Sequence, residues 1–231
     1  MSFFFKIITL LFLLKLLVLS SSLAATTDAN FQTWLDSYKK IALKKGISKK
    51  TIDIAFKDVK FLEQVIRYDR KQPEFIEDTN TYVSKRATDY RAKKAKELLK
   101  KNTHLFNEVE NKFKVEKEIL LALWGIETQF GKYVGKMDII SSLATLSYDK
   151  RRRDFFSSQL LTLLELIDKK IIDPSELYGS WAGAYGNFQF MPSTISNYAI
   201  DFDGDNTIEL KTSLEDSLAS AANYINKVGW K

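Results

Sequence analysis

Apolar residues recur in this chain at helical spacing, and strand-like alternation is weak throughout, which constrains the fold more than any other feature. Near the N-terminal end, Phe31, Trp34, Tyr38, Ile41 and Ala42 follow one another at intervals of mostly three or four. Only nine glycines and three prolines occur among 231 residues, which disfavours a turn-rich all-β fold. The sequence therefore predicts a mainly α protein.

The first 25 residues have the pattern of a secretory signal peptide. Lys6 precedes an apolar run that ends in small residues, from Ser20 to Ala25. Lys15 interrupts this run and makes it a poor membrane-spanning helix, although an uncleaved N-terminal anchor is the alternative. We expect an exported protein that meets the membrane only transiently, through residues 1–25.

Two helical regions are predicted after the signal peptide. A lysine-rich N-terminal region covers 26–104, and a core denser in aromatic and small residues covers 105–231. In the first region, Gly46 and Ser48 mark the end of one helix and the N-cap of the next. The basic stretch 85–101 is interpreted as a solvated helix face, and export argues against a nucleic-acid partner.

The rare residue types narrow the chemistry. The chain has no cysteine, which excludes disulfides, thiol nucleophiles, thiolate metal sites and a lipidated N-terminal cysteine. His104 is the only histidine and has polar neighbours, so neither a Ser-His-Asp triad nor a histidine-rich zinc site is expected. Catalysis would have to use carboxylates, hydroxyls, amides or lysines. The net charge of +6 suits a polyanionic or mixed-charge partner such as the cell wall without singling it out.

Glu127 is the carboxylate whose sequence context is most unusual. On a helix it falls in the same arc as the apolar residues Ile119, Leu120, Leu123, Trp124, Ile126 and Phe130. Burial of an isolated carboxylate is costly and raises its pKa, as a general acid near neutral pH requires. The alternative is a structural glutamate that pairs with an arginine or caps a helix.

The segment 179–193 (GSWAGAYGNFQFMPS) combines small residues with aromatic and amide side chains. Such a backbone allows a bulky hydroxyl-rich ligand to approach, while aromatic rings stack on sugars and amides form hydrogen bonds with them. Trp181, Tyr185 and Gln189 are the candidate contacts. The alternative is an ordinary close crossing of helices through small residues.

The segment 201–209 (DFDGDNTIE) resembles the first half of an EF-hand loop. Asp201, Asp203, Asp205 and Thr207 supply oxygens at alternate positions, and their mutual repulsion favours a bound cation. The closing acid would be Glu215 or Asp216. We expect a structural Ca²⁺, with a solvated acidic turn as the alternative.

Taken together, these segments resemble the lytic murein transglycosylase B family. The matching pieces are 65–75 (VIRYDRKQPEF), 124–131 (WGIETQFG), 142–148 (SLATLSY), 179–186 (GSWAGAYG), 189–193 (QFMPS), 201–205 (DFDGD), 222–224 (ANY) and 229–230 (GW). The match as a whole covers nearly all of the chain after the signal peptide, and several ordered motifs are far more specific than one.

The resemblance implies a lysozyme-like helical domain with an EF-hand-like loop, located in the periplasm. We also expect a monomer. It implies cleavage of the β-1,4 bond between N-acetylmuramic acid (MurNAc) and N-acetylglucosamine (GlcNAc) in peptidoglycan glycan strands, with formation of a 1,6-anhydro ring. The chemistry requires no cofactor, so the expected Ca²⁺ is structural. Members usually continue well past Gly229 and Trp230, so this chain is expected to be a minimal or truncated version.

The resemblance also assigns roles to individual residues. Glu127 matches the catalytic acid/base. Positions that line the glycan groove are matched by Ser180, Gln189 and Tyr224, with Tyr185 beside them, and arginines near the peptide stem by Arg152 and Arg153. The calcium ligands are matched by Asp201, Asp203, Asp205, Thr207 and Asp216, the last preferred to Glu215. Two alternatives stay open: a hydrolytic muramidase, with Asp138 or Asp149 as the nearest second acid, and a non-catalytic peptidoglycan-binding protein.

Overall fold

A computed structural model of the chain describes residues 29–71 and 78–230, which belong to two compact units, 1–45 and 46–231. The described part of the first unit is one helix over 29–44. On this helix Phe31, Tyr38 and Ala42 are buried, as their spacing predicts, whereas Ile41 is 52% exposed. The predicted signal peptide over 1–25 lies outside the described residues, as does the part of the 65–75 motif after Lys71.

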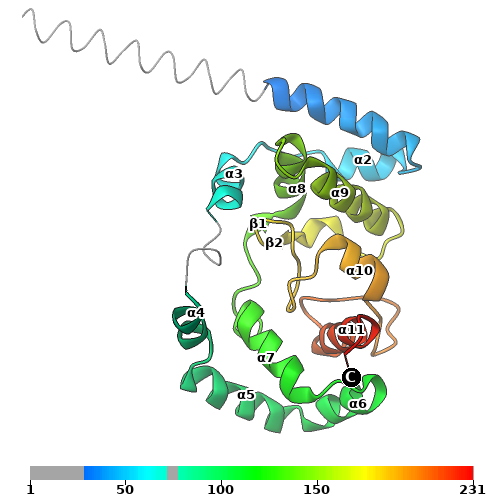
Figure 1. The fold of residues 1–231 in the computed structure, drawn as a ribbon. Helices are drawn as coiled ribbons and strands as arrows, with labels where there is room; N and C mark the ends of the chain where they lie inside the picture. Colours follow the sequence, from blue (N-terminus) through cyan, green and yellow to red (C-terminus); the bar gives the residue numbers. More distant parts are fainter. Residues whose placement is uncertain (1–28, 72–77, 231) are drawn as a thin grey trace, which may run out of the picture. The chain divides into compact units, whose positions relative to one another are not determined.

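The described part of the second unit is almost entirely helical, which confirms the prediction of a mainly α protein (Figure 1). Its helices are α2 (Lys49–Ala55), α3 (Glu63–Arg70), α4 (Thr79–Arg86), α5 (Asp89–Lys101), α6 (Thr103–Phe113), α7 (Lys117–Thr128), α8 (Ile139–Tyr148), α9 (Arg153–Asp168), α10 (Pro192–Tyr198) and α11 (Leu214–Lys227). The short elements are β1 (Met137–Asp138), the 3₁₀ helix η2 (Pro174–Glu176) and β2 (Tyr178–Gly179).

Side-chain caps set where several of these helices begin. A side-chain oxygen of the residue before the helix accepts a hydrogen bond from an amide of the first turn, which satisfies a donor that has no partner within the helix. Ser48 does this for α2, as the sequence predicted. The same cap begins α4, α5, α8 and α11, from Asp78, Thr88, Asp138 and Ser213.

Helix α8 forms the centre of one half of the second unit. Residues 139–147 are all buried, because α3, α9 and β1 pack around this helix. Its small polar side chains bind backbone amides of a neighbouring segment. Ser141 accepts a hydrogen bond from the amide of Lys60 (3.1 Å), and Thr145 accepts one from the amide of Leu62 (3.0 Å). The buried hydroxyls therefore replace backbone partners for a stretch that has no secondary structure of its own.

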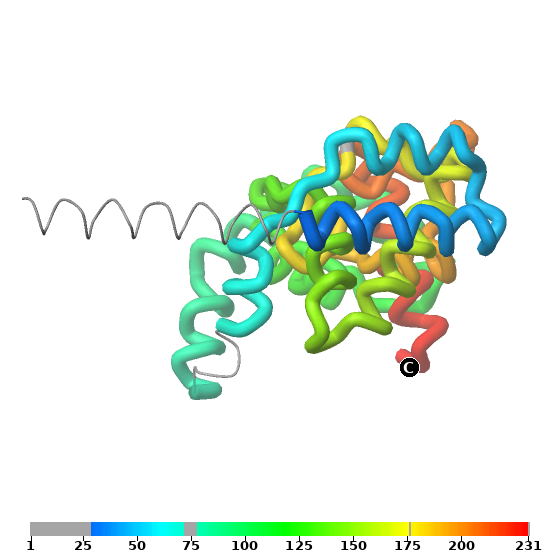
Figure 2. Tube along the Cα trace, turned by 90° about the horizontal axis from the view of Figure 1, so that it is seen from above, coloured from blue at the N-terminus to red at the C-terminus, as the bar shows by residue number. Residues whose placement is uncertain are grey.

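The other half of the second unit is built around α7 and α11. Helix α11 packs against α6, α7 and α10, and α7 also packs against α5 and α6. Figure 2 shows α3 and α4, in cyan and teal, at the edge of this unit. The domain boundary expected near residue 104 falls inside α6, and it stays a prediction. In the described part of the chain, no helix is both long and apolar enough to cross a membrane.

Strands β1 and β2 pair antiparallel, and the chain before β1 approaches β2 closely. Met137 pairs with Gly179, and Asp138 pairs with Tyr178. Gly135 has φ +91°, and a Cβ atom on it would lie 2.1 Å from the carbonyl carbon and oxygen of Gly179. Only a residue without a side chain fits here, because backbone cannot give way as a flexible side chain can.

We predict that Gly135→Ala destabilises the protein much more than Gly46→Ala. Gly46 has a similar φ of +95°, but a Cβ there would meet nothing within 4 Å. The left-handed conformation alone should cost on the order of 1–2 kcal/mol in either variant, and the clash with Gly179 adds to this cost only at position 135. Urea unfolding measures both free energies. Equal losses in the two variants would contradict the close approach.

Candidate active site

Helix α7 presents two faces, and Glu127 lies at the border between them. Of the predicted apolar arc, Leu120 and Trp124 are buried, whereas Ile119 and Leu123 are half-buried and Ile126 is 44% exposed, so only part of the arc faces the core. Helices α5, α6 and α11 all pack on α7, and Leu123 and Ile126 each line a cavity beside it. The residues that enter the core are Leu120, Leu121, Trp124, Gly125 and Thr128.

Helix α7 ends one residue after Glu127, where the chain turns left-handed. Gln129, Phe130 and Gly131 have φ of 50°, 61° and 82° in succession. The hydroxyl oxygen of Thr128 accepts a hydrogen bond from the amide of Gly131 (3.0 Å), which helps to hold this turn. Phe130 therefore lies beyond the helix, whereas the spacing argument placed it on the helix.

The ring of Phe130 folds back over α7. It meets the ring of Trp124 edge-on, with centroids 5.6 Å apart. Gly125 makes room for it, since a Cβ there would lie 2.8 Å from the ring. The end of α7 is therefore held by the Phe130 ring as well as by the hydrogen bond of Thr128, and Glu127 lies on this helix end.

A second wall comes from the tight turn between β2 and α10. The backbones of Tyr185 and Phe190 exchange two hydrogen bonds of 2.9 Å. Inside this turn Gln189 has φ +52°. Its Nε2 donates to the carbonyl oxygens of Gly186 (2.9 Å) and Val134 (3.1 Å), which fixes the amide in place.

Helix α11 supplies the third wall through Tyr224. The Tyr224 ring packs edge-on against Phe190, with centroids 6.3 Å apart, and against Tyr198, at 5.1 Å. These contacts hold the half-buried ring beside the turn that carries Gln189.

A cavity of about 280 Å³ opens where these three walls and the start of α10 meet. It brings together Glu127, Gln189 and Tyr224, three residues that the sequence singled out. The other lining residues are Leu123, Phe188, Phe190, Met191, Thr194, Ala221 and Ile225. Sequence reasoning did not single out the last six. Phe188 and Phe190 are the sequence neighbours of Gln189, and this adjacency could have predicted that they line the same cavity.

Glu127 is the only carboxylate that lines this cavity among the described residues. Desolvation by the surrounding protein raises the pKa of its carboxyl above the ordinary value. The residue is nevertheless exposed to solvent, so its side chain lies at the open mouth of the cavity, where protein crowds it without covering it. Protein atoms such as those of Leu123 take the place of water around the carboxyl, which disfavours its charged form.

Ser180 and Tyr185 do not line this cavity. The hydroxyl oxygen of Ser180 accepts hydrogen bonds from the amides of Ala182 (3.3 Å) and Ala184 (2.9 Å), so it caps the turn after β2. Tyr185 contributes its backbone to the turn described above. Both residues stabilise the turn that carries Gln189, whereas the resemblance assigned Ser180 to the groove itself, with Tyr185 beside it.

The arginines near residue 152 are engaged elsewhere. Arg152 forms a salt bridge with Asp69, and Arg151 forms another with the same carboxylate at 2.8 Å. Burial alone would raise the pKa of Asp69, but the hydrogen bonds and charges of Arg152 and Arg151 lower it overall. Arg153 is exposed and donates to the carbonyl oxygen of Tyr148 (2.9 Å). None of these arginines lines the cavity at Glu127.

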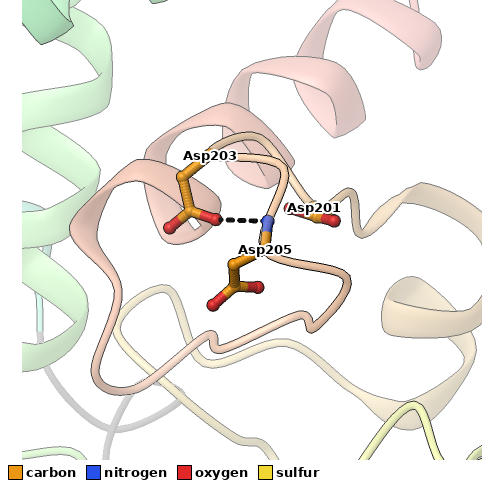
Figure 3. A group of neighbouring side chains, drawn as sticks. All are labelled: Asp201, Asp203 and Asp205. Atoms are coloured by element: carbon orange, nitrogen blue, oxygen red, sulfur yellow. Dashed lines mark hydrogen bonds between the residues drawn. The ribbon is translucent and has the colours of Figure 1, made fainter.

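The predicted metal loop gathers three of its expected ligands. Carboxylate oxygens of Asp201, Asp203 and Asp205 lie within 4.8 Å of one another. Figure 3 shows the three side chains on one loop, with Asp203 accepting a hydrogen bond from the amide of Asp205. Thr207 donates to Asp205 from both its amide (2.8 Å) and its hydroxyl (2.6 Å). All these donors are hard oxygens, which suits Ca²⁺ or Mg²⁺.

Asp216, the expected fifth ligand, hydrogen-bonds to the backbone of the loop. Its side chain is buried, at 1% exposure, and does not join the three clustered carboxylates. Its two oxygens accept hydrogen bonds from the amides of Phe202 (2.7 Å) and Glu209 (2.9 Å). Asp216 therefore ties the two ends of the loop to α11.

A larger hollow of about 510 Å³ lies between α4, α5 and α7. Its α7 side is formed by Glu118, Leu121, Ala122, Gly125 and Ile126, so it opens on a different face of that helix from Glu127. The lining is mostly apolar. We assign the site to the smaller cavity, because an acid, an amide and a phenol converge there.

The raised pKa of Glu127 predicts how stability depends on pH. The folded protein holds this proton to higher pH than the unfolded chain, so the contribution of Glu127 to stability falls as pH rises above about 4.3. Glu127→Gln cannot ionise and should melt slightly higher than the wild type at about pH 7, with no difference below about pH 3.5. Thermal melts at both pH values measure this. Glu118→Gln, an exposed position on the same helix, is the control, and a pH-independent difference for Glu127→Gln would contradict the assignment.

Comparison with known proteins agrees with this geometry. A family model described as the transglycosylase SLT domain matches residues 30–231. The chain is 44% identical over 117 residues to the membrane-bound lytic murein transglycosylase B of Escherichia coli, and the match covers 50% of this chain and 32% of that protein. The chain thus spans about a third of the length of this relative.

Solved structures show the same likeness. SltB3 from Pseudomonas aeruginosa, solved with NAG-NAM-pentapeptide and with NAG-anhNAM-pentapeptide, is 37% identical, with a TM-score of 0.83 over 87% of this chain and 54% of that chain in the first complex. The Escherichia coli lytic transglycosylase Slt35, solved with bulgecin A and with calcium, is 32% identical, with a TM-score of 0.74 over 88% and 64%. The lysozyme-like fold is thereby confirmed, and the chain belongs to the transglycosylase SLT domain family.

Proposed function

We propose that this chain is a peptidoglycan lytic transglycosylase. It cleaves the β-1,4 bond between MurNAc and GlcNAc and leaves a 1,6-anhydroMurNAc end, with Glu127 as the single acid/base. The observation that carries the proposal is the lone carboxyl of raised pKa in a cavity that also presents an amide and a phenol. The NAG-anhNAM product bound to SltB3 supports the same reaction.

One carboxyl suffices for this reaction because the substrate provides the nucleophile. Glu127, protonated, donates to the glycosidic oxygen as the bond to C1 breaks. The resulting carboxylate then accepts the proton of the muramic 6-hydroxyl, whose oxygen attacks C1 and closes the anhydro ring. A pKa raised by desolvation favours the first step, and the open cavity mouth leaves room for the sugar.

A hydrolytic muramidase would need a second carboxylate that flanks the same bond or activates water. Asp138 caps α8 through the amide of Ser141 (2.5 Å). Asp149 pairs with Arg70 at 3.0 Å. Neither lines the cavity of Glu127, and this favours the single-acid reaction over hydrolysis.

The glycan strand is proposed to contact Gln189 and Tyr224 next to Glu127. Both side chains line the cavity, and both are held by contacts within the protein, so little conformational freedom is lost when a sugar binds. Ser180, Tyr185, Arg152 and Arg153 remain candidates for contacts with parts of the polymer farther from the cleaved bond. For Arg152 this would require the polymer to reach a guanidinium already paired with Asp69.

We also propose a structural Ca²⁺ held by Asp201, Asp203, Asp205 and Thr207. The clustered carboxylates and the calcium complex of Slt35 support it. Asp216 would stabilise the loop from below without contacting the ion. The ion would take no part in the reaction, and no other cofactor is proposed.

The proposed place of action is the periplasm. A secretory signal over residues 1–25 would export the chain, and its proposed partner is the glycan strand of peptidoglycan. We expect a monomer that binds no nucleic acid and contacts the membrane only during export.

Glu127→Gln should lower the rate of peptidoglycan cleavage by about 10²–10⁴-fold, since removal of a general acid/base costs this much. The assay is release of soluble muropeptides from purified peptidoglycan. Glu118→Gln is the matched control, because Glu118 lies on the same helix but does not line the cavity of Glu127. Full activity of Glu127→Gln would remove the proposed acid/base.

Mass spectrometry of the wild-type products distinguishes the candidate functions. We expect 1,6-anhydroMurNAc ends, because the 6-hydroxyl of the substrate replaces water as nucleophile. Reducing ends would indicate a hydrolase instead. Binding to peptidoglycan without any soluble product would indicate a non-catalytic protein.

Calcium should raise the melting temperature of the wild type relative to the protein in chelator, because a ligand that binds only the folded state stabilises it. Asp203→Asn should reduce this rise. Asp58→Asn, an exposed aspartate outside the loop, should keep it. Identical wild-type melting curves in excess calcium and in chelator would contradict the metal site.

A further inference from the structure

Asn187 lies directly behind the cavity of Glu127 without lining it. It sits inside the turn between Tyr185 and Phe190, next to Phe188 and Gln189, whose side chains face the cavity. Its own side chain points the other way and is buried, at 6% exposure. A buried amide of this kind must find hydrogen-bond partners within the protein.

The Asn187 side chain joins two helices and a loop end. Its Oδ1 accepts a hydrogen bond from the indole Nε1 of Trp124 on α7 (3.2 Å). Its Nδ2 donates to the hydroxyl oxygen of Ser217 on α11 (3.1 Å) and to the carbonyl oxygen of Lys211 (3.1 Å). One amide thus spans α7, α11 and the segment that ends the acidic loop.

The backbone of Asn187 repeats the same connections. Its amide donates to the carbonyl oxygen of Leu210 (2.8 Å), and its carbonyl oxygen accepts from the hydroxyl of Thr128 (2.8 Å). Trp124 and Thr128 are one helical turn apart on α7 and bracket Glu127. The residue therefore holds the helix at two points on either side of the proposed acid/base.

These contacts connect the three walls that carry the polar groups of the site. Glu127 stands on α7, Gln189 on the turn, and Tyr224 on α11, and each of these elements bonds to Asn187 or contains it. A shift of any one wall would break at least one hydrogen bond of a buried group, which is costly when the group cannot reach water.

We propose that Asn187 is a positioning residue for the reaction: it holds the Glu127 helix at a fixed place relative to Gln189 and Tyr224. The expected effect on the reaction rate rests on the proposed function, whereas the expected effect on the position of the Glu127 helix does not. Asn187 contacts no substrate, so its loss should affect the rate of the bound complex more than the affinity for glycan.

The test uses Asn187→Ala in the full chain. With a soluble peptidoglycan oligomer, kcat should fall about 10- to 100-fold, as expected when a reacting group moves by about 1 Å, while KM stays nearly unchanged. Independently of activity, the carboxyl ¹³C signal of Glu127, assigned by its loss in Glu127→Gln, should titrate at a lower pH than in the wild type. Tyr224 is the other titratable side chain that lines the cavity.

Two further variants separate positioning from general stability. Thr128→Val removes only the hydroxyl that bonds to the Asn187 carbonyl and the Gly131 amide. It should therefore lower kcat and shift the Glu127 titration in the same direction as Asn187→Ala, but by less. If Asn187→Ala does not fold, this variant tests the inference in its place. Thr51→Val is the control: Thr51 is also 6% exposed, and its hydroxyl donates to Asp168 (2.6 Å) at a place that lines neither cavity. It should lose stability without change in kcat or in the Glu127 titration.

The outcomes are distinct. Wild-type kcat and wild-type Glu127 titration in a folded Asn187→Ala protein would overturn the inference, as would equal effects in Thr51→Val. A wild-type protein without cleavage activity would remove the proposed function, while a shifted Glu127 signal in Asn187→Ala would still support positioning.

Discussion

The left-handed turn that ends α7 is the constraint on which the site depends. Three successive residues, Gln129 to Gly131, adopt a conformation that costs energy for residues with side chains. The hydroxyl of Thr128 and the ring of Phe130 hold this turn from two sides. Because the helix stops there, Glu127 occupies its last turn and projects beside the 185–190 segment instead of being followed by more helix.

The site also depends on the different roles of two faces of α7. Trp124 and Thr128 enter the protein and carry hydrogen bonds to Asn187, whereas Glu127, one residue before Thr128, faces the cavity. The buried face thus fixes the position of the helix, and the neighbouring face carries the proposed acid/base, Glu127. A carboxyl on such a helix end can have a raised pKa without being enclosed, since crowding by protein suffices to weaken the solvation of its charge.

The helices and the central acid could be predicted from the sequence, because helical spacing, caps and motif order are local features. Ser48 as an N-cap and Glu127 beside Gln189 and Tyr224 are examples. Which side chains of α7 are buried could not be predicted from the sequence. The spacing of Ile126 and Phe130 does not reveal that α5, α6 and α11 cover the other faces of this helix. Arg152 shows the same limit: its partner Asp69 is 83 residues away, and only the fold brings the two together.

The hydrogen bonds that Asp216 accepts hold the acidic loop at both of its ends. Amides at both ends, from Phe202 and Glu209, already bond to one buried carboxylate. The backbone of the loop is thus shaped by the protein itself, and a cation arriving there has little chain entropy to remove. For the proposed Ca²⁺, substitutions at Asp201, Asp203, Asp205 or Thr207 would change the affinity for the ion, while the hydrogen bonds of Asp216 to the loop ends stay unaltered.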